Sequence, residues 1–139
     1  MIGGGSWATA LTKVLTDNKH AVNWWVRNPD SRKALKEHGH NSRYISSVHF
    51  EKNSIHVSED LIDTIRKSEI IFLAVPSAFI KITLAAIHPQ DLKHKLIVSA
   101  VKGMIPQENS VMADYFHNHF AVQYSNLAVI SGPLHAEEV

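Results

Sequence analysis

The stretch Met1-Ile2-Gly3-Gly4-Gly5-Ser6-Trp7-Ala8-Thr9-Ala10-Leu11 decides the fold class. Gly3, Gly5 and Ala8 fit the spacing G-x-G-x-x-[G/A], which places a tight turn between a strand and a helix. The first glycine permits the turn, the second lets the backbone approach a pyrophosphate, and the small third residue allows close helix–sheet packing. Phosphates then bind free N–H groups at the positive end of the helix. The stretch predicts a dinucleotide-binding turn, with a flexible turn as the alternative.

The remaining chain alternates short apolar runs with amphipathic stretches, which is typical of strand–helix units around a parallel sheet. Most expected strands are continuous apolar runs, as in sheets that helices cover on both faces. They span residues 21–26, 55–57, 70–75, 96–99 and 127–131. The sequence therefore predicts an α/β fold in one domain over residues 1–139, with a doubly wound, Rossmann-like and mostly parallel sheet.

Helices are expected between these strands. The first carries an apolar stripe predicted to face the sheet, while its polar residues face away; the stripe is Trp7, Ala10, Leu11, Val14 and Leu15, and the polar residues are Thr9, Thr12, Lys13 and Thr16. Further helices are predicted over 29–37, from an N-cap at Ser58 to residue 67, over 77–87 and over 109–117. Residues 40–53 are expected to form a long loop.

The strand before the glycines is reduced to Met1 and Ile2, whereas strands average about five residues. We therefore expect either a truncated or a very short first strand.

Arg27 lies 19 residues after Ala8, where dinucleotide folds carry the residue that reads the adenosine ribose. An acidic residue there would bind the ribose hydroxyls of NAD and repel a 2′-phosphate. Arginine attracts that phosphate and can stack on adenine. Arg27 thus favours NADP, or the use of both cofactors, over strict NAD. The alternative is a solvated arginine at a helix start.

Composition excludes several other classes. The chain has 14 Lys+Arg against 13 Asp+Glu, which gives no broad basic field for nucleic acid, and it has no cysteine for disulfides or zinc. No apolar run is long enough for an integral membrane segment, so we expect a cytoplasmic protein. The histidine pairs in His38-Gly39-His40 and His117-Asn118-His119 lack the spacing and third ligand of metal sites, so no metal is expected.

Six motifs in order closely resemble the bacterial NAD(P)-dependent sn-glycerol-3-phosphate dehydrogenases. They are Gly3-Gly4-Gly5-Ser6-Trp7-Ala8-Thr9-Ala10-Leu11, Trp25-Val26-Arg27-Asn28-Pro29, Asn41-Ser42-Arg43-Tyr44-Ile45, Leu73-Ala74-Val75-Pro76-Ser77, Ser99-Ala100-Val101-Lys102-Gly103 and Ser131-Gly132-Pro133-Leu134-His135-Ala136-Glu137-Glu138-Val139. The resemblance implies an enzyme that interconverts dihydroxyacetone phosphate and sn-glycerol 3-phosphate with NAD(P) for phospholipid synthesis.

The resemblance also implies roles for individual residues. Ser6 and Trp7 would contact the pyrophosphate, and Arg27 with Tyr44 would lie at the adenosine end. Phe79 would pack beside the cofactor. The alternative for Phe79 is ordinary packing of its own helix, and the alternative for Tyr44 is a role in anchoring a loop. The remaining implied contacts are Lys102 with both cofactor and substrate, Gly132 with the substrate, and Ala136 with the nicotinamide.

Two positions depart from the family pattern. Ala8 replaces a glycine, which the need for a small residue tolerates. Leu134 replaces a serine or threonine beside the substrate and cannot donate that hydrogen bond. In the resembled family the lysine that moves the proton belongs to an all-helical second domain. We expect this domain to be absent from the chain, which would leave the fragment inactive alone.

Two alternative functions stay open. One is another two-domain dehydrogenase of the β-hydroxyacid type, or a ketoacid reductase, which would share the glycine turn. Another is a module that senses dinucleotides without turnover. The sequence also leaves the oligomeric state undetermined, with a homodimer of the longer enzyme as one alternative.

Overall fold

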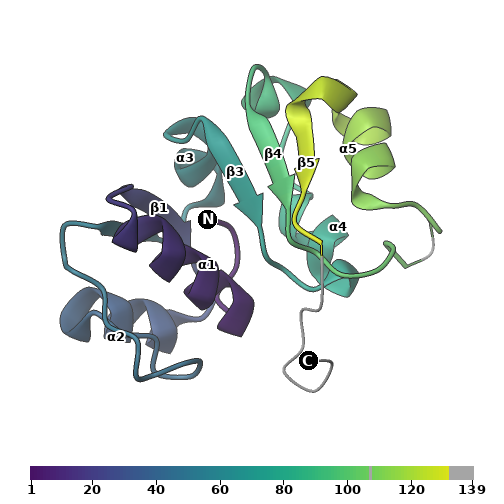
Figure 1. Cartoon of the computed structure of the whole chain (residues 1–139). Coiled ribbons are helices and arrows are strands. Elements are labelled where there is room, and N and C mark those ends of the chain that lie inside the picture. Colours follow the sequence, from purple (N-terminus) through teal and green to yellow (C-terminus); the bar gives the residue numbers. More distant parts are fainter. Residues whose placement is uncertain (107, 132–139) are drawn as a thin grey trace.

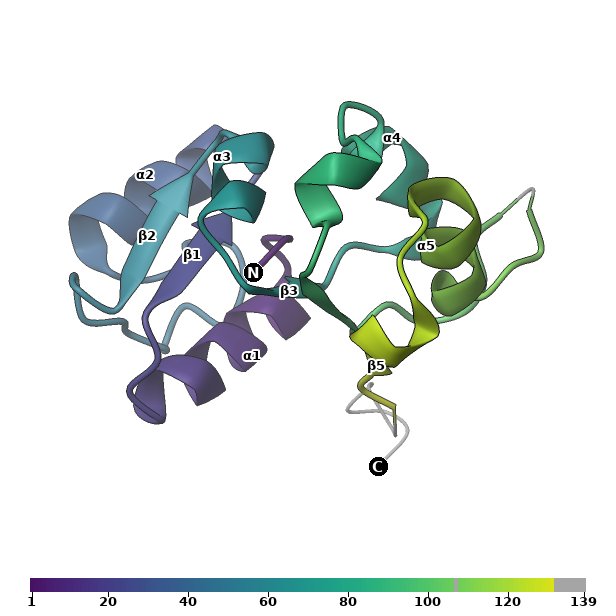
Figure 2. The ribbon, with the colours of Figure 1, turned by 90° about the horizontal axis from the view of Figure 1, so that it is seen from above.

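A computed structural model describes residues 1–106 and 108–131 of the chain. Its strands are β1 (Val22–Trp25), β2 (Ile55–Ser58), β3 (Ile70–Leu73), β4 (Leu96–Ser99) and β5 (Leu127–Val129). β1 pairs with β2, β3 with β4, and β4 with β5, all in parallel. Figures 1 and 2 show this sheet between helices. The predicted α/β, Rossmann-like fold is confirmed, although most strands are shorter than expected.

The segment before the glycine turn joins the two parts of the sheet. Ile2 forms a parallel bridge with Trp25 of β1 on one side and with Leu73 of β3 on the other. Its N–H donates to the Phe72 carbonyl at 2.8 Å, and its carbonyl accepts from the Ala74 N–H at 2.9 Å. The order across the sheet is therefore β2, β1, the Ile2 segment, β3, β4 and β5. The reversal of strand order on either side of Ile2 opens a crevice at the carboxyl edge.

Five helices are present in the described residues: α1 (Ser6–Asp17), α2 (Pro29–His38), α3 (Leu61–Arg66), α4 (Ile80–Leu84) and α5 (Met112–Phe120). The predicted end of α2 is confirmed to within one residue: the helix ends at His38, and Gly39 closes it in the left-handed conformation with φ of 68°. Short 3-10 turns span Ser77–Phe79, Pro89–Leu92 and Tyr124–Asn126. None of the described helices is both long and apolar enough to span a bilayer.

Three of the predicted helices have wrong boundaries. Ser58 still pairs in β2, and the N-cap of α3 is Asp60, whose carboxylate accepts from the Asp63 N–H at 2.9 Å. The helix expected over 77–87 begins as a 3-10 turn and ends at Leu84, where a tight turn carries Ile87 back into the core. The last helix spans Met112–Phe120 instead of 109–117, which leaves Val111 48% exposed.

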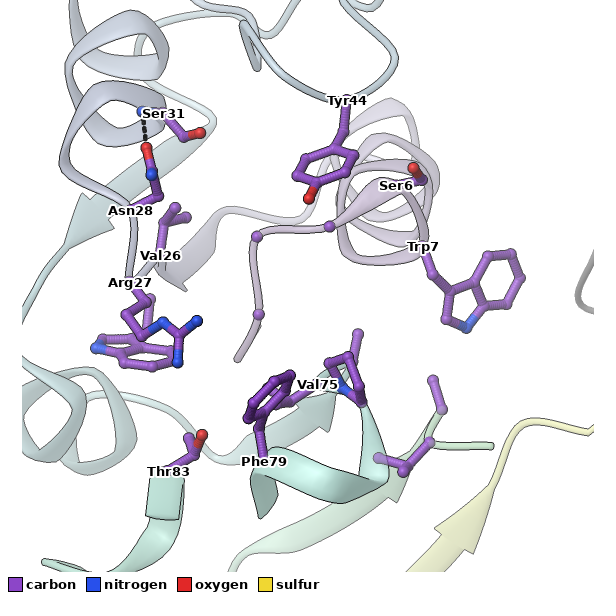
Figure 3. Close-up of a pocket in the computed structure, with 18 of the residues that line it drawn as sticks. Ser6, Trp7, Val26, Arg27, Asn28, Ser31, Tyr44, Val75, Phe79 and Thr83 are labelled. Carbon is purple, nitrogen blue, oxygen red and sulfur yellow. Dashed lines mark hydrogen bonds between the residues drawn. The ribbon is translucent and has the colours of Figure 1, made fainter. Parts of the chain in front are cut away.

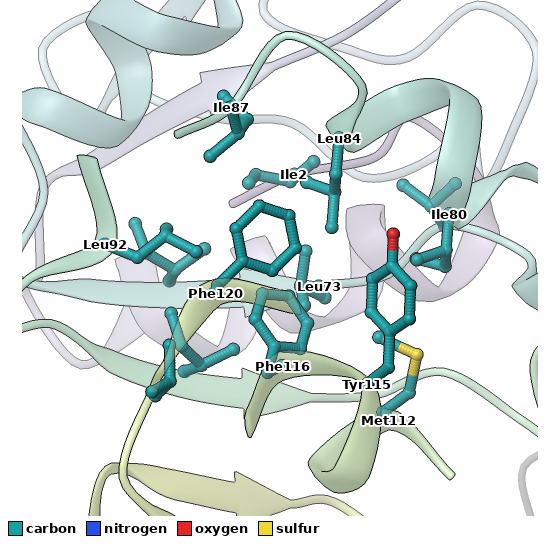
Figure 4. Packing of buried hydrophobic residues seen from close by; sticks show 14 of the residues in the cluster. Ile2, Leu73, Ile80, Leu84, Ile87, Leu92, Met112, Tyr115, Phe116 and Phe120 are labelled. Carbon is teal, nitrogen blue, oxygen red and sulfur yellow. The ribbon is translucent and has the colours of Figure 1, made fainter. Parts of the chain in front are cut away.

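A hydrophobic core lies on each face of the sheet, because alternate strand residues point to opposite sides. One core joins Ile2 and Leu73 to residues from α3, α4 and α5, including Phe116 and Phe120 (Figure 4). The other joins Met1 and Trp24 to α1 and α2. Helices therefore cover both faces, as predicted.

The buried face of α1 differs from the predicted apolar stripe. Thr9 and Thr12 are fully buried with Ala8, while Val14 is 59% exposed. Small side chains let this helix lie close to the sheet, and the Thr9 hydroxyl is satisfied by donating to the Gly5 carbonyl at 2.9 Å. Leu11 and Leu15 do pack against the core, as expected.

Candidate functional site

A crevice of about 850 Å³ lies at the carboxyl edge of the sheet. Its lining comes from residues 3–7, 25–29, 31, 43–44, 74–77, 79, 83 and 100–102. These segments include the glycine turn and the ends of β1, β3 and β4, which meet at this edge because the strands are parallel. Figure 3 shows the side chains around one opening, with Trp7 on the side opposite Asn28 and Ser31.

Among the described residues, the charged side chains that line the crevice are all cationic. Arg27, Arg43 and Lys102 line it, whereas no aspartate or glutamate does. The chain as a whole is nearly neutral, with 14 Lys+Arg and 13 Asp+Glu. This local excess of positive charge favours an anionic ligand.

The three glycines of the turn differ in what a side chain would meet at each position. Gly3 has φ of 129°, and a Cβ there would lie 2.3 Å from the Ala74 carbonyl oxygen. A Cβ on Gly4 would lie 2.8 Å from Cγ1 of Val26. Gly5 has an ordinary φ of −83°, and nothing in the described structure lies within 4 Å of a Cβ placed on it. Gly5 therefore leaves open space on the crevice lining, where a ligand can approach the backbone.

The start of α1 has unpaired hydrogen-bond donors. Gly5 is its N-cap and supplies no side-chain hydrogen bond, and the first turn contains no acidic residue. Among the described residues, the N–H groups of Gly5, Ser6 and Trp7 have no partner. The Trp7 indole N–H is also buried without a partner there. With the positive end of the helix dipole, the three backbone N–H groups are chemically suited to an anion.

The end of β1 reaches across the crevice to the segment after β3. The Arg27 guanidinium lies over the Phe79 ring, 5.5 Å from its centroid, in a cation–π contact. Arg32 fixes the backbone here by donating to the carbonyls of Val26 and Arg27 at 2.9 and 2.7 Å, and it pairs with Glu59 at 2.7 Å. Arg27 and Phe79 are themselves exposed, so both are accessible to a ligand.

The start of α2 forms a second polar wall. The Asn28 side chain caps the helix by accepting from the Ser31 N–H at 2.9 Å. Ser31 lines the crevice although it is only 1% exposed, and its buried hydroxyl has no hydrogen-bond partner in the described structure. Tyr44, 41% exposed, lies toward the glycine turn in Figure 3. Arg43, which also lines the crevice, adds a positive charge to the lining.

Lys102 follows β4 on the remaining side of the crevice. Its ammonium is buried and has no hydrogen-bond partner among the described residues. An unpaired buried ammonium is costly, and an anionic ligand would remove that cost.

Glu108 lies farther along the loop that follows Lys102. Lys81 and His119 contact the Glu108 carboxylate at 2.6 and 3.0 Å and hold the pKa of Glu108 below its usual value. These contacts tie the loop to α4 and α5.

The structure brings most of the predicted site residues together. Those lining the crevice are Gly3, Gly5, Ser6, Trp7, Arg27, Tyr44, Phe79 and Lys102. Ala8 is fully buried and packs against the core behind the turn, so it does not line the crevice. Gly132, Leu134 and Ala136 lie outside the described residues.

Sequence reasoning missed Ser31, Arg43 and Thr83, which also line the crevice. Arg43 stands in the quoted Asn41–Ile45 motif, which could have suggested it. Ser31 and Thr83 carry no local signal because only the tertiary fold brings them to the strand ends. In the described portion, no group of three or more His, Asp or Glu side chains is arranged to hold a metal ion.

The sequence profile described as "NAD-dependent glycerol-3-phosphate dehydrogenase N-terminus" matches residues 1–139. The chain belongs to this family. A glycerol-3-phosphate dehydrogenase [NAD(P)+] of Pseudomonas fluorescens strain SBW25 is 32% identical over 139 residues, which are all of this chain and 40% of that protein. The corresponding protein of Chlorobium phaeobacteroides is 35% identical over 138 residues, which are 99% of this chain and 41% of that protein.

Solved glycerol-3-phosphate dehydrogenase structures have the same fold. The crystal structure from Coxiella burnetii superimposes with a TM-score of 0.82 at 25% identity, covering 99% of this chain and 41% of that one. The Saccharomyces cerevisiae structure gives 0.73 at 24% identity, covering 99% and 42%. The chain thus spans about two fifths of the length of the relatives it matches.

Proposed function

We propose that this chain binds NAD(P)(H) in the crevice, as the cofactor-binding part of a dehydrogenase acting on glycerol 3-phosphate. The observation that carries the proposal is the start of α1, where unpaired N–H groups and the open side of Gly5 face a crevice lined by cations. A dinucleotide pyrophosphate needs this combination of close backbone approach and positive potential. The family membership supports the same reading.

The adenosine end would lie against Arg27, Phe79 and Tyr44, in the opening between β1 and α2. The cations Arg27 and Arg43 and the unpaired Ser31 hydroxyl suit a 2′-phosphate on the ribose. An acidic residue, which would favour NAD, is absent from the described lining. These groups support the use of NADP, or of both cofactors, over strict NAD.

The nicotinamide end would lie near the ends of β3 and β4, beside Val75 and Lys102. When bound, the nicotinamide exchanges a hydride with the carbon that bears the substrate oxygen. The Lys102 ammonium is suited to hold a phosphate or to stabilise negative charge on that oxygen. Gly132, Leu134 and Ala136 remain predicted contacts in this half of the site. The proposed substrate pair is dihydroxyacetone phosphate and sn-glycerol 3-phosphate.

Isothermal titration calorimetry of the 139-residue chain with NADPH, NADP⁺, NADH and NAD⁺ tests the proposal. We expect saturable binding with one site per chain, and tighter binding of the 2′-phosphorylated pair. Lys13→Ala removes a cation of α1 that does not line the crevice. This variant tests whether charge outside the crevice affects binding, and it should leave the affinity unchanged. Absence of binding of all four dinucleotides at millimolar concentration would overturn the proposal.

A further inference from the structure

We propose that Asn41 is a positioning residue that aims the N–H groups of the glycine turn at the phosphates of the ligand. The inference rests on the proposed function and assigns a role to a residue that does not line the crevice. Asn41 is fully buried behind the turn. Its amide donates to the Gly4 carbonyl and to the Thr9 hydroxyl, both at 3.0 Å, and its oxygen accepts from the Arg43 N–H at 3.2 Å.

This hydrogen-bond pattern fixes the orientation of the Asn41 amide. Both N–H bonds of its NH₂ group are used, and they meet two oxygen atoms. The reversed orientation would place the side-chain carbonyl against the Gly4 carbonyl, leaving two acceptors in contact without a proton between them. The amide is therefore locked, and it can in turn lock the groups that it contacts.

Asn41 belongs to a set of buried donors that hold all three glycine carbonyls. The Trp24 indole N–H donates to the Gly3 carbonyl at 2.6 Å, and Asn41 binds the Gly4 carbonyl. The Thr9 hydroxyl, which accepts from Asn41, donates to the Gly5 carbonyl at 2.9 Å. Asn41 thus acts on two of the three carbonyls, directly on one and through Thr9 on the other.

Holding a carbonyl also aims the next N–H group. In a trans peptide unit the C=O and the following N–H point in opposite directions. Drawing the Gly4 and Gly5 carbonyls back toward Asn41 and Thr9 therefore turns the Gly5 and Ser6 N–H groups away from them. Gly5 and Ser6 line the crevice, and their N–H groups have no partner in the described structure. These are the donors that a pyrophosphate would use.

A glycine turn needs this support more than other turns do. Glycine has the widest choice of backbone conformations, so a run of three would otherwise sample many orientations of its N–H groups. No side-chain packing restrains Gly5, because no described atom lies within 4 Å of the place where its Cβ would be. Pre-orienting the donors lowers the entropy lost when the ligand binds.

The same amide connects the turn to the opposite wall. By accepting from the Arg43 N–H, Asn41 closes a local turn that fixes the backbone just before Tyr44. Arg43 and Tyr44 line the crevice facing the glycine turn. Asn41 therefore sets the position of both sides of the ligand site from behind, without touching the ligand.

Thr9 offers a test that separates positioning from simple stability. Thr9→Val keeps the shape of the side chain and removes the hydroxyl, whereas Thr9→Ser keeps the hydroxyl and removes a buried methyl group. Thr12→Val is the matched control, because Thr12 is equally buried in α1 and its hydroxyl has no described partner. Asn41→Asp keeps the acceptor for Arg43 and removes both donors.

The dissociation constants of NADPH and NADH are measured by calorimetry, and unfolding in urea is measured for each variant. We expect Thr9→Val and Asn41→Asp to weaken the tighter ligand about tenfold, corresponding to the loss of about one hydrogen bond. Thr9→Ser and Thr12→Val should stay within about twofold of the original affinity, even where their unfolding midpoints fall.

Three results distinguish failure of the proposed function from failure of this inference. If the unmodified chain binds neither dinucleotide, the proposed function fails and this inference fails with it. If the unmodified chain binds but Thr9→Val and Asn41→Asp keep its affinity, the proposed function stands and Asn41 has no positioning role. Affinities that merely follow the unfolding midpoints across all four variants would likewise assign Asn41 to stability alone.

Discussion

Helices α1 and α3 begin in opposite ways. α1 begins at Gly5 with no side-chain cap and no acidic residue in its first turn. α3 begins at Asp60, whose carboxylate accepts from the Asp63 N–H, and it has a second acid in that turn. A cap usually stabilises a helix, so α1 forgoes a common source of stability. Its uncapped end faces the crevice, whereas the end of α3 does not line it. The contrast supports the proposal that the start of α1 binds an external anion.

Gly5→Asp would give α1 the start that α3 has. The backbone of Gly5 suits any residue, and its side chain would have free space, so the aspartate can cap the helix. We expect the free energy of unfolding to rise by a few tenths of a kcal/mol. Binding of NADPH should weaken more than about 100-fold, because a carboxylate would then stand where the pyrophosphate binds. Calorimetry and urea unfolding on the same variant measure both changes.

Asp60→Ala is the reciprocal control. It removes the cap of α3, far from the crevice lining, and should lower the free energy of unfolding by about 1 kcal/mol while leaving the affinity for NADPH unchanged. A Gly5→Asp variant that still binds NADPH tightly would refute the special role of the α1 start. Gly5→Ala then separates the steric effect of a Cβ from that of the charge.

The contrast between the two helix starts also shows what the sequence could predict. The spacing of Gly3, Gly5 and Ala8 identified the uncapped end of α1, and counting from Ala8 placed Arg27 at the end of β1. Both signals are local, because a turn type and a strand length fix them. The ends of β3 and β4 were also found, since parallel strands with apolar runs deliver their last residues to one edge.

The errors arose where tertiary contacts override a local pattern. Hydrophobicity alone placed Val14 against the sheet, but close packing required Thr9 and Thr12 there. Ser58 looked like a cap, yet strand pairing held it in β2 and Asp60 took that role. Asn41 was recognised only as part of a motif, because its three hydrogen bonds join segments that are distant in sequence.

Helix α2 is intermediate between α1 and α3, because an uncharged amide caps it. Asn28→Asp keeps a side chain of equal capping ability and adds a negative charge on the crevice lining, beside Ser31. We expect about tenfold weaker binding of NADPH, because the new charge would repel a 2′-phosphate. NADH, which has a hydroxyl there, should be affected less than about threefold. Competition titrations with the two reduced cofactors measure the ratio.

An equal loss for NADH and NADPH would place the 2′-phosphate elsewhere in the crevice. The matched control is Asn18→Asp, an exposed position after the end of α1 that does not line the crevice. It adds the same charge to the chain and should change neither affinity.

The smallest expected effect concerns the 3-10 turn Pro89–Leu92. Like α3, this turn has an aspartate at its start, and the contribution of that aspartate to stability depends on pH. The Asp91 carboxylate accepts from the His88 N–H at 3.0 Å and pairs with Arg66 at 3.1 Å. The backbone hydrogen bond from His88, followed by the contacts with Arg66, holds the pKa of Asp91 below its usual value of 3.8, against the opposing effect of burial. The unfolded chain therefore binds more protons in acid than the folded chain does. The stabilisation by Asp91 is present above the unfolded pKa and is lost as the pH falls through the folded pKa.

We expect the urea midpoint to fall as the pH is lowered below about 5. Asp91→Asn should reduce the slope of the free energy of unfolding against pH, by an amount that corresponds to less than about one bound proton. Urea unfolding between pH 3 and pH 7 measures the difference in slope. Asp30→Asn is the control, because Asp30 is exposed in the first turn of α2 and has no described ion pair. If both variants reduce the pH dependence of the urea midpoint equally, the hydrogen bond from the His88 N–H to Asp91 does not determine that dependence.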